Sequence, residues 1–132
     1  MTFLYILLGI VGAFIGLMIF MRILIYQKSS AMKGKPAPDL AGKPGKRIKK
    51  GKTAMFYFYS PQCGACKAMT PLVKDLAKKN EGVFPVDISR DMEIARKFSV
   101  MATPTLVIVR EKMVAEIIIG PQPAARLEAL AS

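Results

Sequence analysis

The two cysteines, Cys63 and Cys66, constrain the fold of this chain more than any other feature, and they are the only two it has. A short apolar and aromatic run, residues 55–59, comes directly before them and predicts a buried strand. A helix-favouring stretch follows them. The first thiol therefore lies at a helix N-terminus, where unpaired N–H groups and the helix dipole favour a thiolate, and the second lies one turn later, within disulfide reach. This arrangement predicts thiol–disulfide exchange, in which Cys63 attacks a substrate disulfide and Cys66 resolves the mixed disulfide.

The same C-x-x-C spacing also supplies half of many zinc sites. The chain has no histidine and no further cysteine, so a mononuclear zinc site would need carboxylates or a second chain. Two unreactive structural thiols are the other alternative. We expect no metal and no cofactor beyond a redox-active Cys63–Cys66 disulfide.

The residues around the cysteines extend the pattern. Residues 60–67, Ser-Pro-Gln-Cys-Gly-Ala-Cys-Lys, followed by Pro71, resemble the active-site segment of the thioredoxin family. The stretch 102–105, Ala-Thr-Pro-Thr, resembles the cis-proline loop of that family, and Gly120 matches a glycine after its last strand. The resemblance covers residues 52–132. It implies an α/β, thioredoxin-like fold with a central mixed sheet flanked by helices.

The resemblance also implies roles for particular residues. The family acts on protein or peptide thiols and disulfides and receives electrons from an upstream donor. In this chain the catalytic residues would be Cys63 and Cys66, and the substrate-binding residues would be Gln62, Gly64, Ala65, Thr103 and Pro104.

A buried charge pair of the family pattern is missing, and Gln62 and Ala65 replace the tryptophan and the proline usual at their positions. A buried aspartate of the family falls here on Tyr57, and the lysine that faces it aligns with Pro85. Their joint absence is consistent, because either charge buried alone would be costly. It leaves open which group deprotonates Cys66. No histidine lies between the cysteines, so the motif differs from that of strongly oxidising enzymes, and we expect a reducing to middling potential.

Hydrophobic patterning predicts the elements of the domain. We expect strands at 53–59, 83–87, 105–110 and 113–119, and helices at 63–79, 92–98 and 124–131, with the cis-proline loop between 98 and 105.

The first segment of the chain explains a hydrophobic content of 52%. No residue from Thr2 to Met21 is charged, and twenty helical residues span about 30 Å, the thickness of the hydrocarbon core of a bilayer. The segment lacks the basic start, short apolar core and cleavage site of a signal peptide. We therefore predict a single transmembrane helix over residues 2–26 in the cell (inner) membrane.

Residues 27–52 are rich in Lys, Gly and Pro, which predicts a basic linker between this anchor and a domain at 53–132. Within it, residues 34–40 resemble the lead-in segment of membrane-anchored thioredoxin-like reductases, which predicts an extra short strand. Ten of the twenty basic residues lie between Arg22 and Lys52, within a net charge of +11. We expect the lipid bilayer as partner of these charges and no nucleic acid, with a purely solvated topology signal as the alternative.

The basic residues after the helix favour a cytoplasmic domain, whereas anchored relatives in bacteria often lie outside the cytoplasm. The working hypothesis is a membrane-tethered thiol–disulfide oxidoreductase that reduces protein disulfides. The alternative is a redox-inactive thioredoxin-fold binding or assembly module at the membrane.

Overall fold

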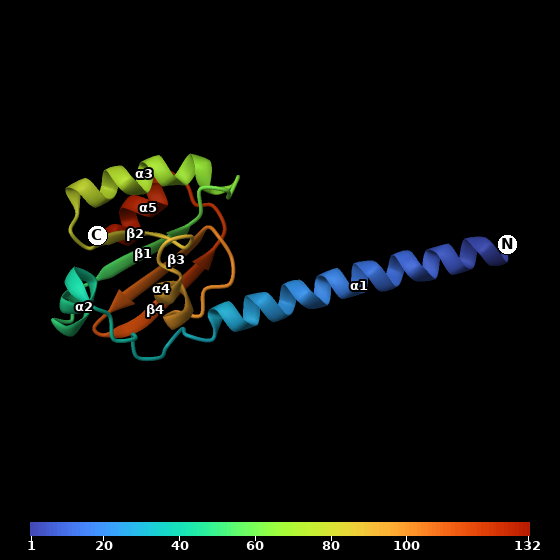
Figure 1. Cartoon of the computed structure of the whole chain (residues 1–132), viewed down its shortest axis with the longest axis horizontal. Coiled ribbons are helices and arrows are strands. Elements are labelled where there is room, and N and C mark those ends of the chain that lie inside the picture. Colours follow the sequence, from blue (N-terminus) through green and yellow to red (C-terminus); the bar gives the residue numbers. More distant parts are fainter.

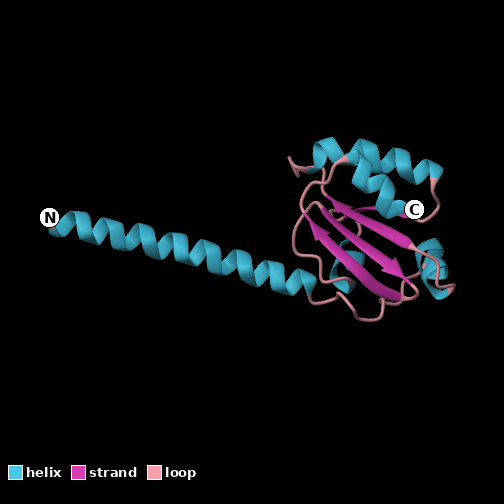
Figure 2. Cartoon of the chain, turned by 180° about the vertical axis from the view of Figure 1, so that it is seen from behind, coloured by secondary structure: helices cyan, strands magenta, loops and turns pink.

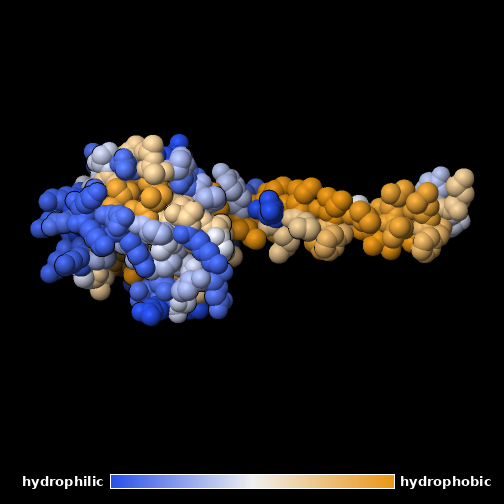
Figure 3. Space-filling view, turned by 90° about the horizontal axis from the view of Figure 1, so that it is seen from above, coloured by the Kyte–Doolittle hydropathy of each residue, from blue (hydrophilic) through white to orange (hydrophobic). Residues whose placement is uncertain are grey.

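A long helix, α1 (Thr2–Ser30), projects from a sheet domain in the computed structural model of the chain (Figure 1). The structure describes the main chain of residues 1–132 and the side chains outside residues 29–30. The stretch Thr2–Lys28 is long and apolar enough to cross a membrane, and it is not buried against the rest of the chain. Figure 3 shows a mostly hydrophobic surface along α1 and a largely hydrophilic surface on the domain.

The sheet that the structure describes has four strands in the order β2-β1-β3-β4. These are β1 (Ala54–Tyr59), β2 (Val83–Asp87), β3 (Thr105–Arg110) and β4 (Met113–Ile119). Strand β1 pairs parallel with β2, and the other pairs are antiparallel, so the predicted mixed sheet is confirmed (Figure 2). Parallel neighbours need a crossover, and helix α3 (Cys66–Lys79) supplies it.

Alternation along β1 divides the core into two layers, because successive strand residues point to opposite faces. Phe56 and Phe58 pack on one face with α4 (Met92–Lys97), the residues that follow it, and residues 40 and 48. Met55 and Tyr57 pack on the other face with α3 and α5 (Ala124–Ala131). Helices therefore cover both faces of the sheet.

The prediction of a linker over residues 27–52 requires correction. Helix α1 continues to Ser30, and residues 42–49 form helix α2 (Gly42–Lys49). Leu40 and Ile48, each 6% exposed, belong to the core. Gly45 allows this packing, because a Cβ at this position would collide with the carbonyl group of Leu40. Two large apolar side chains thus anchor in the core a stretch whose composition is typical of a linker.

The chain between α1 and α2 runs along the edge strand β4. Pro36 forms an antiparallel bridge with Met113, and the neighbouring main-chain groups of residues 34–37 and 112–114 exchange hydrogen bonds. The short strand expected from the lead-in pattern is therefore a single bridge that extends the edge of the sheet.

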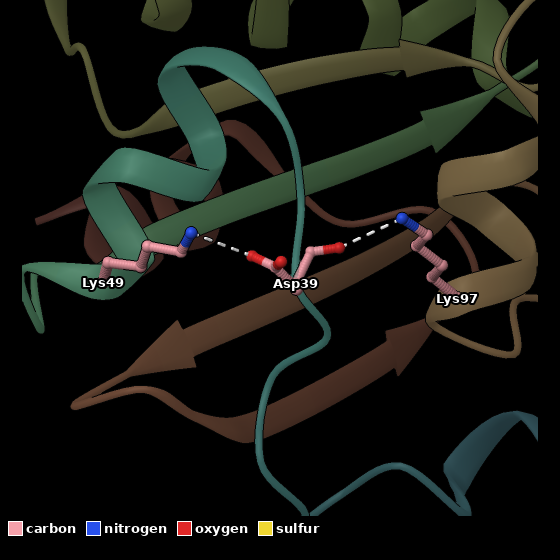
Figure 4. Close-up of polar contacts among 3 residues, drawn as sticks. All are labelled: Asp39, Lys49 and Lys97. Carbon is pink, nitrogen blue, oxygen red and sulfur yellow. Dashed lines mark hydrogen bonds and ion pairs between the residues drawn. The ribbon is translucent and has the colours of Figure 1, made fainter.

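Asp39 connects this lead-in segment to two helices (Figure 4). Lys49 Nζ of α2 lies 3.2 Å from Asp39 Oδ1, and Lys97 Nζ of α4 donates a hydrogen bond of 3.0 Å to the main-chain oxygen of Asp39. The Lys49 and Asp39 side chains are 70% and 82% exposed, so the ion pair contributes at most about 1 kcal/mol. Burial of Leu40 and Ile48, rather than this charge pair, holds the segment in place.

Candidate active site

The loop between β1 and α3 carries both cysteines. The helix begins at Cys66, with Ala65 as its N-cap, so the prediction that it begins at Cys63 is wrong. Cys63 lies in a turn in which its N–H donates to Ser60 O at 3.1 Å and its carbonyl accepts from Cys66 N at 3.3 Å. Both bonds span three residues, the spacing of a tight turn rather than an α-helix.

The two cysteines form a disulfide, with their Cα atoms 5.3 Å apart. Cys63 is half-buried, whereas Cys66 is 1% exposed. A molecule approaching from solvent therefore reaches Cys63 and not Cys66. Among the side chains that the structure describes, no group of three or more His, Cys, Asp or Glu could hold a metal ion.

The loop that precedes β3 lies at the same end of the sheet. The antiparallel register pairs Phe58 with Thr105, so the residues before Thr105 lie beside those that follow β1. The Thr103–Pro104 peptide bond is cis, and Gly120 N donates to Pro104 O at 2.9 Å. The structure thus brings together the two motifs that lie 38 residues apart in the sequence. Thr103 is half-buried and Pro104 is buried, while three further predicted site residues are exposed: Gln62, Gly64 and Ala65.

Tyr57 lies directly beneath the start of α3 and is fully buried. Its hydroxyl lies 3.0 Å from Thr70 Oγ1 and 3.4 Å from the carbonyl oxygen of Cys66. Thr70 Oγ1 in turn donates to the same carbonyl at 2.8 Å, which leaves Tyr57 as the donor to Thr70. In the sheet, Tyr57 pairs with Pro85.

Burial raises the pKa of Tyr57 above its ordinary value of 10.0; the hydrogen bond with Thr70 opposes this shift and Tyr59 adds to it. The phenol is therefore neutral throughout the physiological range. Sequence reasoning missed Thr70, although its position four residues after Cys66 is the spacing at which a threonine hydroxyl reaches a preceding helix carbonyl.

A cavity of about 440 Å³ opens beside the cysteines and is lined by both of them. Its charged lining consists of three basic side chains and one carboxylate: Lys67, Lys74, Arg90 and Asp87. A second cavity, of about 470 Å³, lies between α2 and β2 and contacts neither cysteine. Only the first cavity is placed to take part in chemistry at the disulfide.

Asp87 is the last residue of β2, and its carboxylate accepts two hydrogen bonds from Ser89. Ser89 Oγ donates to Asp87 Oδ1 at 2.6 Å and Ser89 N donates at 2.9 Å. The side-chain hydrogen bond from Ser89 is the main cause that lowers the pKa of Asp87, and the charges of Arg90 and Lys74 add to it. This carboxylate therefore stays ionised at neutral pH and is a weak proton acceptor. Sequence reasoning missed Asp87, whose signal was its place at the C-terminal end of a strand parallel to β1.

Comparison with known proteins agrees with this geometry. A family model described as Thioredoxin matches residues 45–132, which include the second part of α2. The thioredoxin of Bacillus subtilis (strain 168) is 30% identical over 76 residues, 55% of this chain and 73% of that protein. A thioredoxin of Staphylococcus aureus (strain Mu50 / ATCC 700699) is 30% identical over 73 residues, 53% of this chain and 70% of that protein.

Solved structures give the same result. A mutant thioredoxin from Halobacterium salinarum NRC-1 superposes with a TM-score of 0.56 at 25% identity, covering 65% of this chain and 77% of that one. Fasciola hepatica thioredoxin superposes with a TM-score of 0.54 at 29% identity, covering 64% and 86%. Together with the Cys63–Cys66 disulfide, these relatives support thiol–disulfide oxidoreductase chemistry. The chain belongs to the thioredoxin family.

Proposed function

We propose that this protein is a membrane-tethered thiol–disulfide oxidoreductase that reduces protein disulfides. The observation that carries the proposal is the unequal exposure of the two sulfur-bearing residues, with Cys63 half-buried and Cys66 1% exposed. Two-step disulfide exchange requires an accessible thiol that attacks the substrate and a protected thiol that resolves the mixed disulfide.

In the reduced protein, the Cys63 thiolate attacks one sulfur of the substrate disulfide. A mixed disulfide forms, and the second substrate sulfur leaves as a thiolate. Cys66 then attacks Cys63 Sγ, which closes the Cys63–Cys66 disulfide and releases the first substrate sulfur. Two electrons pass from the dithiol to the substrate, and the two protons of the dithiol end on the substrate thiols. A dithiol donor must then reduce the Cys63–Cys66 disulfide again.

The substrate would lie across the loop that holds Cys63 and the loop that holds Pro104. Main-chain groups of Thr103 would hydrogen-bond an extended substrate segment, and Gln62, Gly64 and Ala65 would contact it beside the disulfide. These residues carry no charge, which suits a peptide or protein segment rather than a small anion. Exposed Met101, at 50%, adds an apolar contact next to the loop.

Resolution lacks an obvious base in this protein. Tyr57 occupies the position of the family's aspartate, and with its pKa raised it cannot accept a proton at neutral pH. The proton of Cys66 would pass to water or to the departing thiolate. We expect the resolution rate to climb between about pH 7 and 9, where a thiol ionises.

The membrane part of the proposal rests on α1, whose Thr2–Lys28 stretch meets the length and apolarity that a membrane span needs. Helix α2, which is rich in basic residues, lies at the end of the domain opposite α1 (Figure 1). The basic residues that would contact anionic lipid are therefore Arg22, Lys28, Lys33 and Lys35. These four residues also favour a cytoplasmic domain by the positive-inside rule. A phosphatase fusion at Ser132 tests the side: activity of a periplasm-dependent phosphatase would reverse the assignment.

Insulin reduction by dithiothreitol, with the full chain in detergent micelles, tests the enzymatic proposal. We expect catalysis by the wild-type chain and none by the Cys63→Ser variant. Equal rates for both would favour the redox-inactive binding module instead.

A further inference from the structure

The redox loop and α1 lie toward the same end of the domain. In Figures 1 and 2, the loop between β1 and α3 points in the direction in which α1 leaves, and its tip extends past the point where α1 joins the domain. The loop before β3 lies at this end too, because its register places it beside the end of β1. Helix α2 and the β3–β4 turn lie at the opposite end.

The connection between α1 and the domain is short, and contacts with the core and main-chain hydrogen bonds hold it against the domain. Helix α1 ends at Ser30, and Met32 packs against the core. Gly34 N donates to Val114 O at 2.8 Å, and Val114 N donates to Lys35 O at 2.9 Å. Residues 31–33 alone separate the helix from this paired edge, so the edge stays next to the end of α1.

The length of α1 determines how far above the membrane surface the end of the domain with the redox loop lies. The uncharged stretch Thr2–Met21 spans about 30 Å, which fills the hydrocarbon core. The remaining helical residues, from Arg22 to Ser30, add only about 13 Å. The headgroup layer takes up roughly half of that rise. The tip of the loop with Cys63 reaches slightly past the point where α1 joins the domain, so it is among the parts of the domain that lie nearest to the headgroups.

We infer that the redox site faces the bilayer surface and acts on disulfides that other membrane-anchored proteins carry next to their membrane spans. This inference rests on the proposed function and specifies its substrate class. A disulfide at the same height meets Cys63 by lateral diffusion in the membrane. A large soluble protein would have to enter the narrow space between the domain and the lipid.

The orientation can be measured without any catalysis. Because the chain has no other cysteines, a membrane-impermeant maleimide dye labels Cys63 alone in the Cys66→Ser variant. The comparison variant carries Lys50→Cys, next to α2, together with Cys63→Ser and Cys66→Ser. Both full chains are reconstituted in phosphatidylcholine–phosphatidylglycerol vesicles that hold an energy acceptor on their headgroups.

The domain is about 30 Å across, so the two dyes should differ clearly in height. We expect several-fold more efficient energy transfer from Cys63 than from position 50. Equal efficiencies, or the reverse order, would overturn the inference even if the protein reduces insulin.

A substrate swap tests the functional consequence. Two transmembrane peptides carry the same disulfide-closed loop, one directly after the span and one behind an 18-residue helical spacer that adds five turns and about 27 Å. The pre-reduced full chain, co-reconstituted with each peptide, should reduce the near loop at least about tenfold faster in a single turnover, because only that loop has a high effective concentration at Cys63.

The matched variant has the same 18-residue helix inserted after Ser30. It should prefer the raised loop and keep the wild-type rate with insulin in detergent, and Cys63→Ser should reduce neither loop. Unchanged preference in the insertion variant would refute the inference. Loss of insulin reduction in the wild-type chain would instead refute the proposed function, and energy transfer would still report the orientation.

Discussion

Removal of the Tyr57 hydroxyl tests how the buried phenol contributes to the site. The Tyr57→Phe variant keeps the ring in the core and removes the hydrogen bond of 3.0 Å to Thr70 Oγ1, together with the longer contact of 3.4 Å with the carbonyl oxygen of Cys66. The carbonyl oxygen of Cys66 keeps its bond of 2.8 Å from Thr70, so no buried acceptor loses its last partner. We expect a loss of about 1 kcal/mol in the free energy of unfolding, the net value of one hydrogen bond. For a domain of this size, that loss lowers Tm by about 4–8 °C.

The same variant tests the proposed route of the proton. Because Tyr57 is neutral at physiological pH, its removal should leave the pH dependence of mixed-disulfide resolution unchanged. Stopped-flow reduction of a disulfide peptide from pH 6 to 9, with urea unfolding of the same full chains in detergent, gives both quantities. A pH profile that becomes flat in Tyr57→Phe, or a resolution rate that falls more than about tenfold at a stability cost near 1 kcal/mol, would show that the phenol takes part in proton transfer and refute our reasoning.

Three further predictions follow from the site and the core. Iodoacetamide should alkylate Cys63 before Cys66 in the reduced protein, because Cys66 is 1% exposed. Mass spectrometry of partly labelled protein checks the order, and preferential labelling of Cys66 would reverse the assignment of the attacking and resolving thiols. Gly45→Ala should cost about 1–3 kcal/mol in the free energy of unfolding, because its methyl group collides with main-chain atoms, whereas Gly64→Ala, with open space around it, should change stability by less than about 0.5 kcal/mol. Tyr57 should lower the free energy of unfolding of the wild-type protein above about pH 10. Because the pKa of Tyr57 is higher in the folded than in the unfolded state, its contribution to stability is complete below the unfolded-state pKa and is lost as the pH rises through the folded-state pKa. Tyr57→Phe should therefore lack this loss in urea titrations.

The order and type of the elements could be predicted from the sequence. Strands over residues 83–87, 105–110 and 113–119 and a helix over 124–131 have the predicted bounds, because their burial follows short apolar runs between turn residues. The long first helix follows from an uncharged stretch that has no other way to satisfy its main-chain groups in an apolar surrounding. The pairing of Cys63 with Cys66 follows from a spacing that one turn of chain brings together.

The start of α3 and the fold of residues 40–49 needed the tertiary structure. Local propensity does not distinguish a tight turn from the first turn of a helix, so the helix start was placed three residues too early. Composition does not reveal that Leu40 and Ile48 find space in the core. The turn hydrogen bonds of residues 60–66 decide the first, and packing against a sheet distant in sequence decides the second.

The sequence alone determined which atoms can perform the chemistry, because two cysteines three residues apart at the end of a strand have few other uses. Only the tertiary structure decided what surrounds them. The contact of Tyr57 with Thr70 joins a strand to a helix 13 residues later, and the place of Asp87 in the cavity depends on the parallel pairing of β1 with β2. The direction of the redox loop relative to α1 depends on the pairing of residues 34–37 with β4. Such contacts are set by strand register and packing, which are properties of the folded chain as a whole.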